Sequence, residues 1–154
     1  MSLKGRALRY LAMREHSRAE LERKLARHAV DDSAAPDAAE VGARITAVLD
    51  ELAASGLLSE QRAAEALVTA QARRFGAAKL QQNLRLRGVA PEVAAAALAT
   101  VKASEFERAE AVWRRRFGVP AQDPSDRARQ ARFLTARGFS ADIVRRLVRG
   151  LIDD

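Results

Sequence analysis

Apolar residues recur at intervals of three and four residues along the chain, as at Leu21 and Leu25 or at Leu80 and Leu84. This spacing places the side chains on one face of a helix, and the alternation typical of a half-buried strand is absent. The pattern therefore predicts an all-α protein. Start and stop signals divide it into nine helices, near residues 6–14, 17–28, 37–55, 59–74, 77–87, 91–102, 104–117, 125–137 and 140–150.

The predicted helix starts carry hydroxyl or carboxylate side chains that cap free amide groups. At three of them Glu follows three residues later, which is the capping-box pattern, and these starts are Ser17, Asp37 and Ser104. Simpler N-caps are expected at Ser59, Ser125 and Ser140, and Pro91 suits a first helical position. Glycine adopts the left-handed C-cap conformation without strain, which predicts helix ends at Gly56, Gly88 and Gly138.

The nine helices group into three units because the sequence repeats. A shift of 59 residues lays Leu21 and Leu25 on Leu80 and Leu84. A shift of 50 lays Arg87-Gly88-Val89 on Arg137-Gly138-Phe139. Repeats of three short helices bury their apolar faces by stacking on each other. We expect an elongated, curved array of three tandem three-helix repeats, with the boundaries 1–57, 58–103 and 104–154; the alternative is a single globular bundle.

Two insertions interrupt the repeats, at residues 30–36 and 119–124. Each contains Pro, and we expect both segments to flex and to leave the angle between repeats open.

The composition excludes several kinds of chemistry. The chain of 154 residues has no Cys, which excludes thiol catalysis, disulfides and cysteine zinc sites. His16 and His28 have no acidic cluster at ligand spacing, so we expect neither a metal site nor a cofactor. A glycine-rich phosphate loop and a nucleophile motif are also absent, so we expect no enzyme and no catalytic residue.

The apolar runs are all shorter than the ~20 residues that a membrane helix needs. Residues 1–5 lack the apolar segment of a signal peptide. We therefore expect a soluble, cytoplasmic protein with no membrane partner, and we expect it to be monomeric.

The net charge of +7 is unevenly distributed. Residues 1–29 carry eight cations and three anions, residues 73–91 carry five cations and no anion, and residues 114–149 carry ten cations and three anions. One basic segment per repeat favours a polyanionic partner, either nucleic acid or an acidic protein surface. A bias of the genome toward GC is the alternative source of the many Arg codons.

The candidate binding residues are the cations that cluster along or at the ends of the predicted helices. They are Arg73, Arg74, Lys79, Arg85, Arg87, Arg114, Arg115, Arg116, Arg145, Arg146 and Arg149. Several lie in last turns, where a cation also offsets the helix dipole by ~0.3–1 kcal/mol. That structural role alone accounts for Arg74, Arg87 and Arg137, but it does not account for an anion-free run over residues 73–91.

Two aromatic residues follow basic residues at predicted helix ends, in Arg73-Arg74-Phe75-Gly76 and Arg115-Arg116-Phe117-Gly118. A basic groove with aromatic platforms is typical of single-stranded nucleic acid binding. The rings of Phe75 and Phe117 either lie beside the cations on the surface or close the helix ends. The remaining aromatic residues are expected in helical cores, at Tyr10, Phe106, Trp113, Phe133 and Phe139.

Several phrases in sequence order resemble one known family. They are Ala7-Leu8-Arg9-Tyr10-Leu11, His16-Ser17-Arg18-Ala19-Glu20-Leu21, Leu49-Asp50-Glu51-Leu52, Gly56-Leu57-Leu58-Ser59-Glu60, Arg132-Phe133-Leu134 and Arg137-Gly138-Phe139-Ser140. Their order and spacing resemble the RecX regulators of the RecA recombinase over nearly the whole chain. The chain departs from the family pattern where Leu57-Leu58 replaces an aromatic residue and Ala63 replaces Phe.

The resemblance implies a non-enzymatic modulator. RecX-like proteins consist of three tandem three-helix repeats and bind within the groove of the RecA–DNA filament. They thereby restrain its extension and its recombinase, ATPase and coprotease activities, in recombinational DNA repair and the SOS response. The implied partners are RecA and its filament, together with single-stranded or duplex DNA.

Two other functions remain open from the residues alone. A DNA-binding helical module acting without RecA is one, with Gln81, Gln82 and Asn83 as weak candidates for base contacts. A repeat scaffold for acidic proteins is the other.

Overall fold

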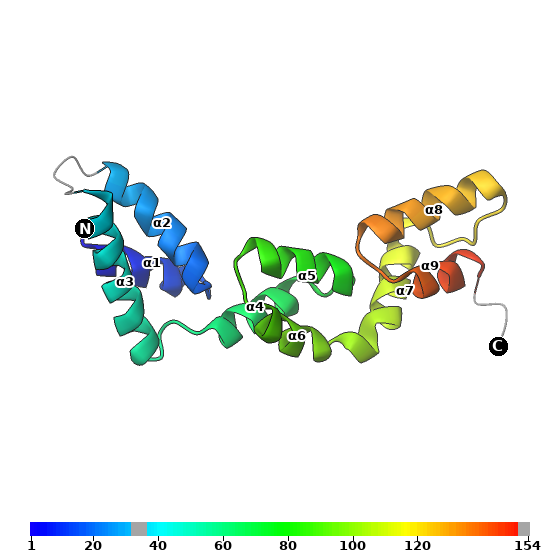
Figure 1. Cartoon of the computed structure of the whole chain (residues 1–154). Helices are drawn as coiled ribbons and strands as arrows, with labels where there is room; N and C mark the ends of the chain where they lie inside the picture. The colour runs from blue at the N-terminus through cyan, green and yellow to red at the C-terminus, as the bar shows by residue number, and fades with distance from the viewer. Residues whose placement is uncertain (32–36, 151–154) are drawn as a thin grey trace.

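The structure is a computed structural model that describes residues 1–31 and 37–150, and these residues form only helices and their connections. The helices lie in three consecutive groups of three, in an elongated, curved array (Figure 1). The predicted all-α fold of three-helix repeats is confirmed. The first repeat holds α1 (Leu3–Met13), α2 (Arg18–Asp31) and α3 (Ala38–Ala54). The second holds α4 (Glu60–Gln71), α5 (Ala77–Leu86) and α6 (Pro91–Ala99), and the third holds α7 (Glu105–Arg116), α8 (Pro124–Ala136) and α9 (Ala141–Val148).

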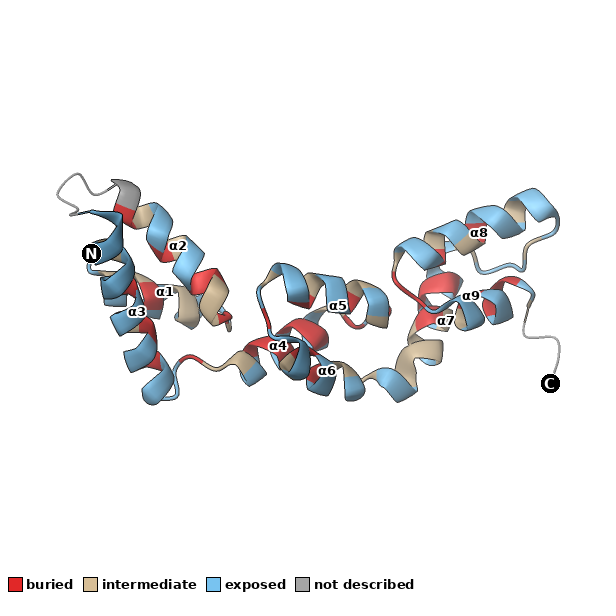
Figure 2. Cartoon of the chain, in the orientation of Figure 1, coloured by how far each residue is buried: buried red, intermediate tan, exposed pale blue. Residues whose placement is uncertain are grey.

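Each repeat has a hydrophobic core of its own, and Figure 2 shows the buried residues on the helix faces that point inward. The first core includes Leu21, Leu25, Leu49 and Leu52. The second includes Leu67, Val68, Leu80 and Leu84. The third includes Trp113, Leu134, Phe139 and Leu147. Because the cores are separate, a single globular bundle is excluded.

Most helix starts follow the predicted caps. Ser17 and Glu20 form a reciprocal capping box, since the side chain of each accepts a hydrogen bond of 3.1 Å from the other's backbone amide. The side chains of three further predicted caps also accept from amides of the first turn, at Asp37, Ser59 and Ser140. The predicted helix ends are confirmed by positive φ angles at Gly56, Gly88 and Gly138.

Two predicted side-chain caps are wrong. Ser104 does stand at the N-cap position of α7, but it also ends the short 3-10 helix η1 (Lys102–Ser104), and its hydroxyl donates to the carbonyl of Val101 instead of accepting an amide of α7. Asp123 caps α8 in place of Ser125, because its carboxylate accepts the amide of Asp126 at 2.8 Å. In both cases a neighbouring residue offers a better partner than the local pattern indicates.

The insertions do not lie between repeats, which corrects the expectation that they leave the repeat angle open. Residues 119–124 connect α7 to α8 inside the third repeat. Buried Gln130 holds this segment: its Oε1 accepts from Trp113 Nε1 at 3.0 Å and its Nε2 donates to the Val119 carbonyl at 3.1 Å. The other insertion connects α2 to α3, and residues 32–36 of it lie outside the described residues.

The second and third repeats meet through backbone hydrogen bonds, at a contact we call the second junction. The amide of Gly76 donates to the Arg137 carbonyl at 2.8 Å, and the amide of Ala78 donates to the Gly138 carbonyl at 3.2 Å. The amide of Ala77 donates to the carboxylate of Glu105 at 2.6 Å. The start of α5 is therefore bonded both to the end of α8 and to the start of α7.

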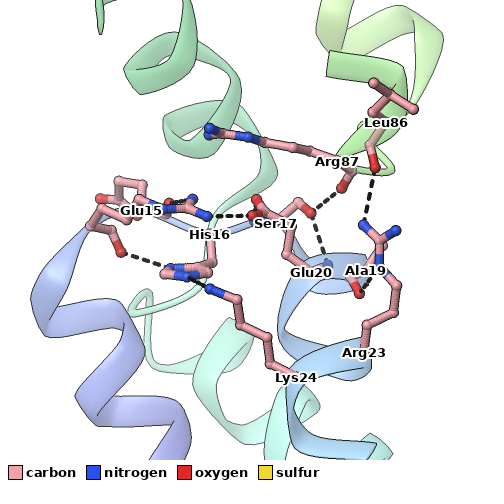
Figure 3. A network of polar contacts seen from close by, with 10 residues as sticks. Glu15, His16, Ser17, Ala19, Glu20, Arg23, Lys24, Leu86 and Arg87 are labelled. Atoms are coloured by element: carbon pink, nitrogen blue, oxygen red, sulfur yellow. Dashed lines mark hydrogen bonds and ion pairs between the residues drawn. The ribbon is translucent and has the colours of Figure 1, made fainter. Parts of the chain in front are cut away.

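The first and second repeats meet through hydrogen bonds between side chains and backbone groups, at the first junction (Figure 3). The Ser17 hydroxyl, at the start of α2, donates to the carbonyl of Arg87, at the end of α5. The amide of Arg18 donates to the carboxylate of Glu60 at 2.6 Å. In each junction, the first residue of the next repeat's first helix is a glutamate that binds the start of the preceding repeat's second helix.

The shared construction lines up the second helices. The end of α8 faces the start of α5, and the end of α5 faces the start of α2, along one side of the array (Figure 1). Opposite ends of the helix dipoles thus meet, which is the favourable arrangement. The angle between repeats is therefore set by these junctions, in which backbone groups are paired.

His16 is buried beside the first junction and is held neutral by its partners. Its Nδ1 lies 3.0 Å from the Arg14 carbonyl and its Nε2 lies 2.9 Å from Lys24 Nζ. Because a carbonyl cannot donate and an ammonium cannot accept, Nδ1 carries the only ring proton. Burial lowers the pKa of His16 below 6.5; the hydrogen bond to Arg14 opposes this, and the charges of Arg14 and Lys24 reinforce it.

We expect the free energy of unfolding to fall as the pH is lowered from 7 to 5. The unfolded chain protonates His16 near pH 6.5, whereas the folded chain resists protonation, so the unfolded state binds the extra proton. The His16→Gln variant should flatten this dependence in urea unfolding. An equally steep dependence in that variant would exclude His16 as its source.

The carboxyl group of Glu20 titrates below the range from pH 7 to pH 5. Burial acts to raise the pKa of Glu20, but hydrogen bonds from Arg14 and from the Ser17 amide lower it below 4.5. The stability it contributes is lost only as the pH falls below about 4.5. Measurements between pH 5 and 7 therefore report on His16 separately.

Candidate functional site

The basic ends of α4 and α7 come together across the second junction. Arg73 and Arg74 follow α4 and are exposed, and Arg115 in the last turn of α7 is exposed as well. The guanidinium of Arg115 donates to the Arg73 carbonyl at 3.4 Å. Two basic clusters that are 42 residues apart in the sequence therefore share one surface.

The predicted cations of α5 differ in their surroundings. Arg85 is exposed, whereas Lys79 is half-buried and packs its backbone and Cβ against Gly138 in the second junction. Arg87 is half-buried at the first junction, and burial lowers its pKa; the charge of Arg14 adds to the effect. Lys79 and Arg87 thus lie within contacts between repeats.

The cations of α7 and α9 that the sequence analysis named are all exposed, but two of them have carboxylate partners. Arg114 pairs with Glu110 at 3.0 Å, and Arg145 lies 3.8 Å from Asp142. Arg146 lies over the ring of Phe106, 4.2 Å from its centroid. Arg116 and Arg149 are also exposed, at the ends of α7 and α9.

Guanidinium groups and phenyl rings alternate across the second junction, in what we call the Arg–Phe row: Arg74, Phe75, Arg137, Phe133, Arg116, Phe117 and Arg129. Phe75 has Arg74 and Arg137 at 5.1 and 5.7 Å from its centroid. Phe133 has Arg137 and Arg116 at 5.0 and 5.3 Å. Phe117 has Arg116 and Arg129 at 5.8 and 5.3 Å. All of these distances are within cation–π range.

The row shows what the sequence analysis missed. Arg137 was assigned to the helix dipole and Phe133 to a core, and Arg129 was not considered. Phe133 does pack on the third core, but it also orients two arginines. Phe75 and Phe117 meet both interpretations, because each packs on a core and each lies beside cations. The sequence signals were the basic residues before Phe75 and Phe117, and, for Arg137, the repeat of Arg87 after 50 residues.

Among residues 1–31 and 37–150, no three side chains of the types His, Cys, Asp and Glu come together as metal ligands. No helix within those ranges has the length and apolar character to cross a membrane.

Comparison with family models and relatives agrees with the order of the repeats. The models for the first, second and third three-helix domains of RecX match residues 4–40, 59–98 and 103–148. The regulatory protein RecX of Leptothrix cholodnii is 50% identical over 149 residues, which cover 97% of this chain and 88% of that protein. The RecX protein of Ralstonia nicotianae is 45% identical and covers 100% of this chain and 92% of its own length.

Solved structures support the fold. The crystal structure of RecX from Lactobacillus salivarius superposes with a TM-score of 0.69 at 21% identity, over 97% of this chain and 94% of that chain. A second crystal structure of a regulatory protein RecX gives a TM-score of 0.71 at 20% identity, over 93% and 69% of the two chains. With three domain models matched in order and relatives up to 50% identical over nearly the full length, the chain belongs to the RecX family of regulatory proteins.

Proposed function

We propose that the chain is a non-enzymatic, cytoplasmic regulator that binds as a monomer in the groove of the RecA–DNA filament. It restrains filament extension and thereby the recombinase, ATPase and coprotease activities. Its units are the three repeats 1–57, 58–103 and 104–154. An elongated array suits this role because it contacts a helical polyanion along its length.

The observation that carries the proposal is the meeting of two basic helix ends on one exposed surface, at Arg73, Arg74 and Arg115. The other exposed cations named from the sequence lie on the second and third repeats, and we include them in the proposed binding residues: Arg85, Arg114, Arg116, Arg145, Arg146 and Arg149. Lys79 and Arg87, which we also named from the sequence, lie within the second and first junctions respectively.

A DNA-binding module acting alone has less support in the geometry. A recognition helix inserts its free N-terminal end into the major groove. The N-terminal end of α5 is bonded to the third repeat, and its C-terminal end meets the first. Asn83 donates to Gln71 at 2.7 Å, so its side chain is already engaged. The residues suggested for base contacts are therefore poorly placed for that role.

The double charge reversal Arg73→Glu/Arg74→Glu should weaken inhibition of filament ATPase about tenfold, because two contacts with a polyanion become repulsive. The matched control is Arg44→Glu/Arg127→Glu, which reverses two exposed cations outside the proposed surface. Titrating RecA–DNA filaments with each variant measures the effect. Equal inhibition by both variants would rule out this surface.

Binding measured at two salt concentrations separates the two functions. RecA filament, free RecA, single-stranded DNA and duplex are compared with the unmodified chain. Preference for the filament over bare DNA supports the regulator, whereas equal binding to filament and to any DNA supports the module acting alone.

A further inference from the structure

The Arg–Phe row holds its cations in fixed orientations. A guanidinium that stacks on a ring loses rotamer freedom, yet it keeps its N–H groups free at the edge for hydrogen bonds in its own plane. Phe133 lies between Arg116 and Arg137, and Phe117 meets its edge with the centroids 5.4 Å apart. Arg74, Arg116 and Arg129 are exposed and Arg137 is half-buried. The row is therefore an ordered set of donors on the surface.

Carboxylates do not neutralise most of the row. Among the described residues, Asp126 is the one acid that pairs with any of its four arginines, and it pairs with Arg129 at 2.7 Å. Arg114, one residue before Arg115 in the same helix end, is paired with Glu110 instead. Four guanidiniums that share rings with each other, with few acids among them, form a positively charged surface that favours an external anion with several charges in a row.

We propose that the Arg–Phe row binds the phosphate groups of a single nucleic acid strand, and that it does so without stacking on the bases. This inference rests on the proposed function and specifies which part of the surface contacts DNA. The ring faces already carry guanidiniums, so the bases have no open platform there. The free edges of the guanidiniums match phosphate oxygens, which accept two parallel hydrogen bonds.

A continuous strand matches the row better than an acidic peptide does. Its charges are regularly spaced along one backbone, whereas acidic side chains reach a surface on flexible stems and lose rotamer freedom on binding. The row also crosses the second junction, since Arg74 follows α4 and Arg137 follows α8. The fixed junction therefore fixes the spacing of the cations that the strand meets.

Removal of charge tests the proposal directly. The Arg116→Gln/Arg137→Gln variant should reduce the slope of log affinity against log salt by roughly 1.4 for fluorescent oligothymidylate, since each phosphate contact on a single strand contributes about 0.7. The control Arg44→Gln/Arg127→Gln removes the same charge outside the row and should change the slope by less than half as much. Equal changes in the two variants would overturn the proposal.

Removal of a ring tests the positioning role of Phe133. In Phe133→Leu both arginines remain but are no longer held, so affinity should fall about fivefold while the salt slope stays unchanged. Phe133→Tyr keeps the ring and should restore affinity. Circular dichroism establishes that both variants are folded. A loss that Tyr does not restore would exclude orientation by the ring.

Two further probes decide the chemistry of the ligand. An abasic oligonucleotide of the same length should bind the unmodified chain within about twofold of oligothymidylate, because bases do not contribute. Much weaker abasic binding would show base stacking and overturn the phosphate assignment. Poly-glutamate that competes as well as the oligonucleotide would overturn the assignment to nucleic acid.

A failure of the Arg–Phe row as a strand-binding site can be distinguished from a failure of the proposed RecA regulation. Inhibition of RecA filament ATPase is measured on the same preparations. Inhibition by the unmodified chain with an unchanged slope in Arg116→Gln/Arg137→Gln overturns the row alone. If the salt slope changes as expected in Arg116→Gln/Arg137→Gln but the unmodified chain does not inhibit the filament ATPase, the proposed regulation of RecA is overturned and the contact with the strand remains supported.

Discussion

Gly76→Ala should lower the free energy of unfolding by about 3–5 kcal/mol, in the range of severe overpacking. A methyl group at Gly76 would lie within 2.6 Å of backbone atoms of Gly138 and Phe139. Backbone cannot move aside as a flexible side chain does, so the two repeats must separate. Separation breaks the hydrogen bond from the Gly76 amide to the Arg137 carbonyl.

Two other glycines provide controls for this variant. Gly42→Ala meets nothing within 4 Å inside α3, and it should stabilise the chain by up to about 1 kcal/mol through helix propensity. Gly56→Ala also meets open space but has a φ of 79°, so it should cost about 1 kcal/mol from backbone strain alone.

Urea unfolding and small-angle scattering together measure the effect. We expect Gly76→Ala to unfold at lower urea and to have a larger radius of gyration, because the third repeat is no longer docked on the second. A variant that matches the unmodified chain in both measurements would contradict the close backbone contact at the second junction.

Arg108→Met should lower the free energy of unfolding by about 3 kcal/mol. The Arg108 guanidinium donates to the carbonyls of Ala72 and Phe75 at 2.7 Å each and to that of Val101 at 3.0 Å. The first two carbonyls belong to the C-cap of α4 and to the connection that follows it, where acceptors have no partner within a helix. Removing the side chain leaves part-buried carbonyls unpaired, which costs about 1–3 kcal/mol for each buried group.

The charge of Arg108 is tolerated because four of its five N–H donors have partners, the fourth being the Ser104 hydroxyl at 3.0 Å. Burial lowers its pKa, and the nearby carboxylate of Glu105 opposes that effect. Arg108→Lys keeps the charge but cannot reach all three carbonyls with one ammonium, so we expect about 2 kcal/mol of destabilisation. Thermal unfolding of both variants tests this expectation. Arg44→Met, which removes an exposed pair with Glu40, is the control and should cost less than about 0.5 kcal/mol. A comparable loss in Arg44→Met and Arg108→Met would contradict the role of the part-buried hydrogen bonds of Arg108.

The sequence by itself determined the features that depend on neighbouring residues. Helix periodicity, the capping box at Ser17 and the turns at Gly88 and Gly138 are local, so the pattern is read directly from the chain. The repeat order followed from offsets of 59 and 50 residues, and the family followed from phrases in sequence order. Prediction was wrong at Ser104 and Ser125, where a neighbouring residue caps better or the helix begins differently.

Only the tertiary structure decided how the repeats join and which cations share a surface. Gly76 has an ordinary φ of −82°, so nothing in its local conformation shows why the residue is glycine. The reason is that Gly138 approaches so closely that a side chain at Gly76 would collide with it. Likewise, Arg137 and Arg116 share the ring of Phe133 only because the third repeat folds α7 against α8 and α9. Such contacts depend on how segments that are distant in the sequence pack against each other. Hydrophobic periodicity predicts the apolar face of each helix, but it does not predict which helix packs against that face or at what angle.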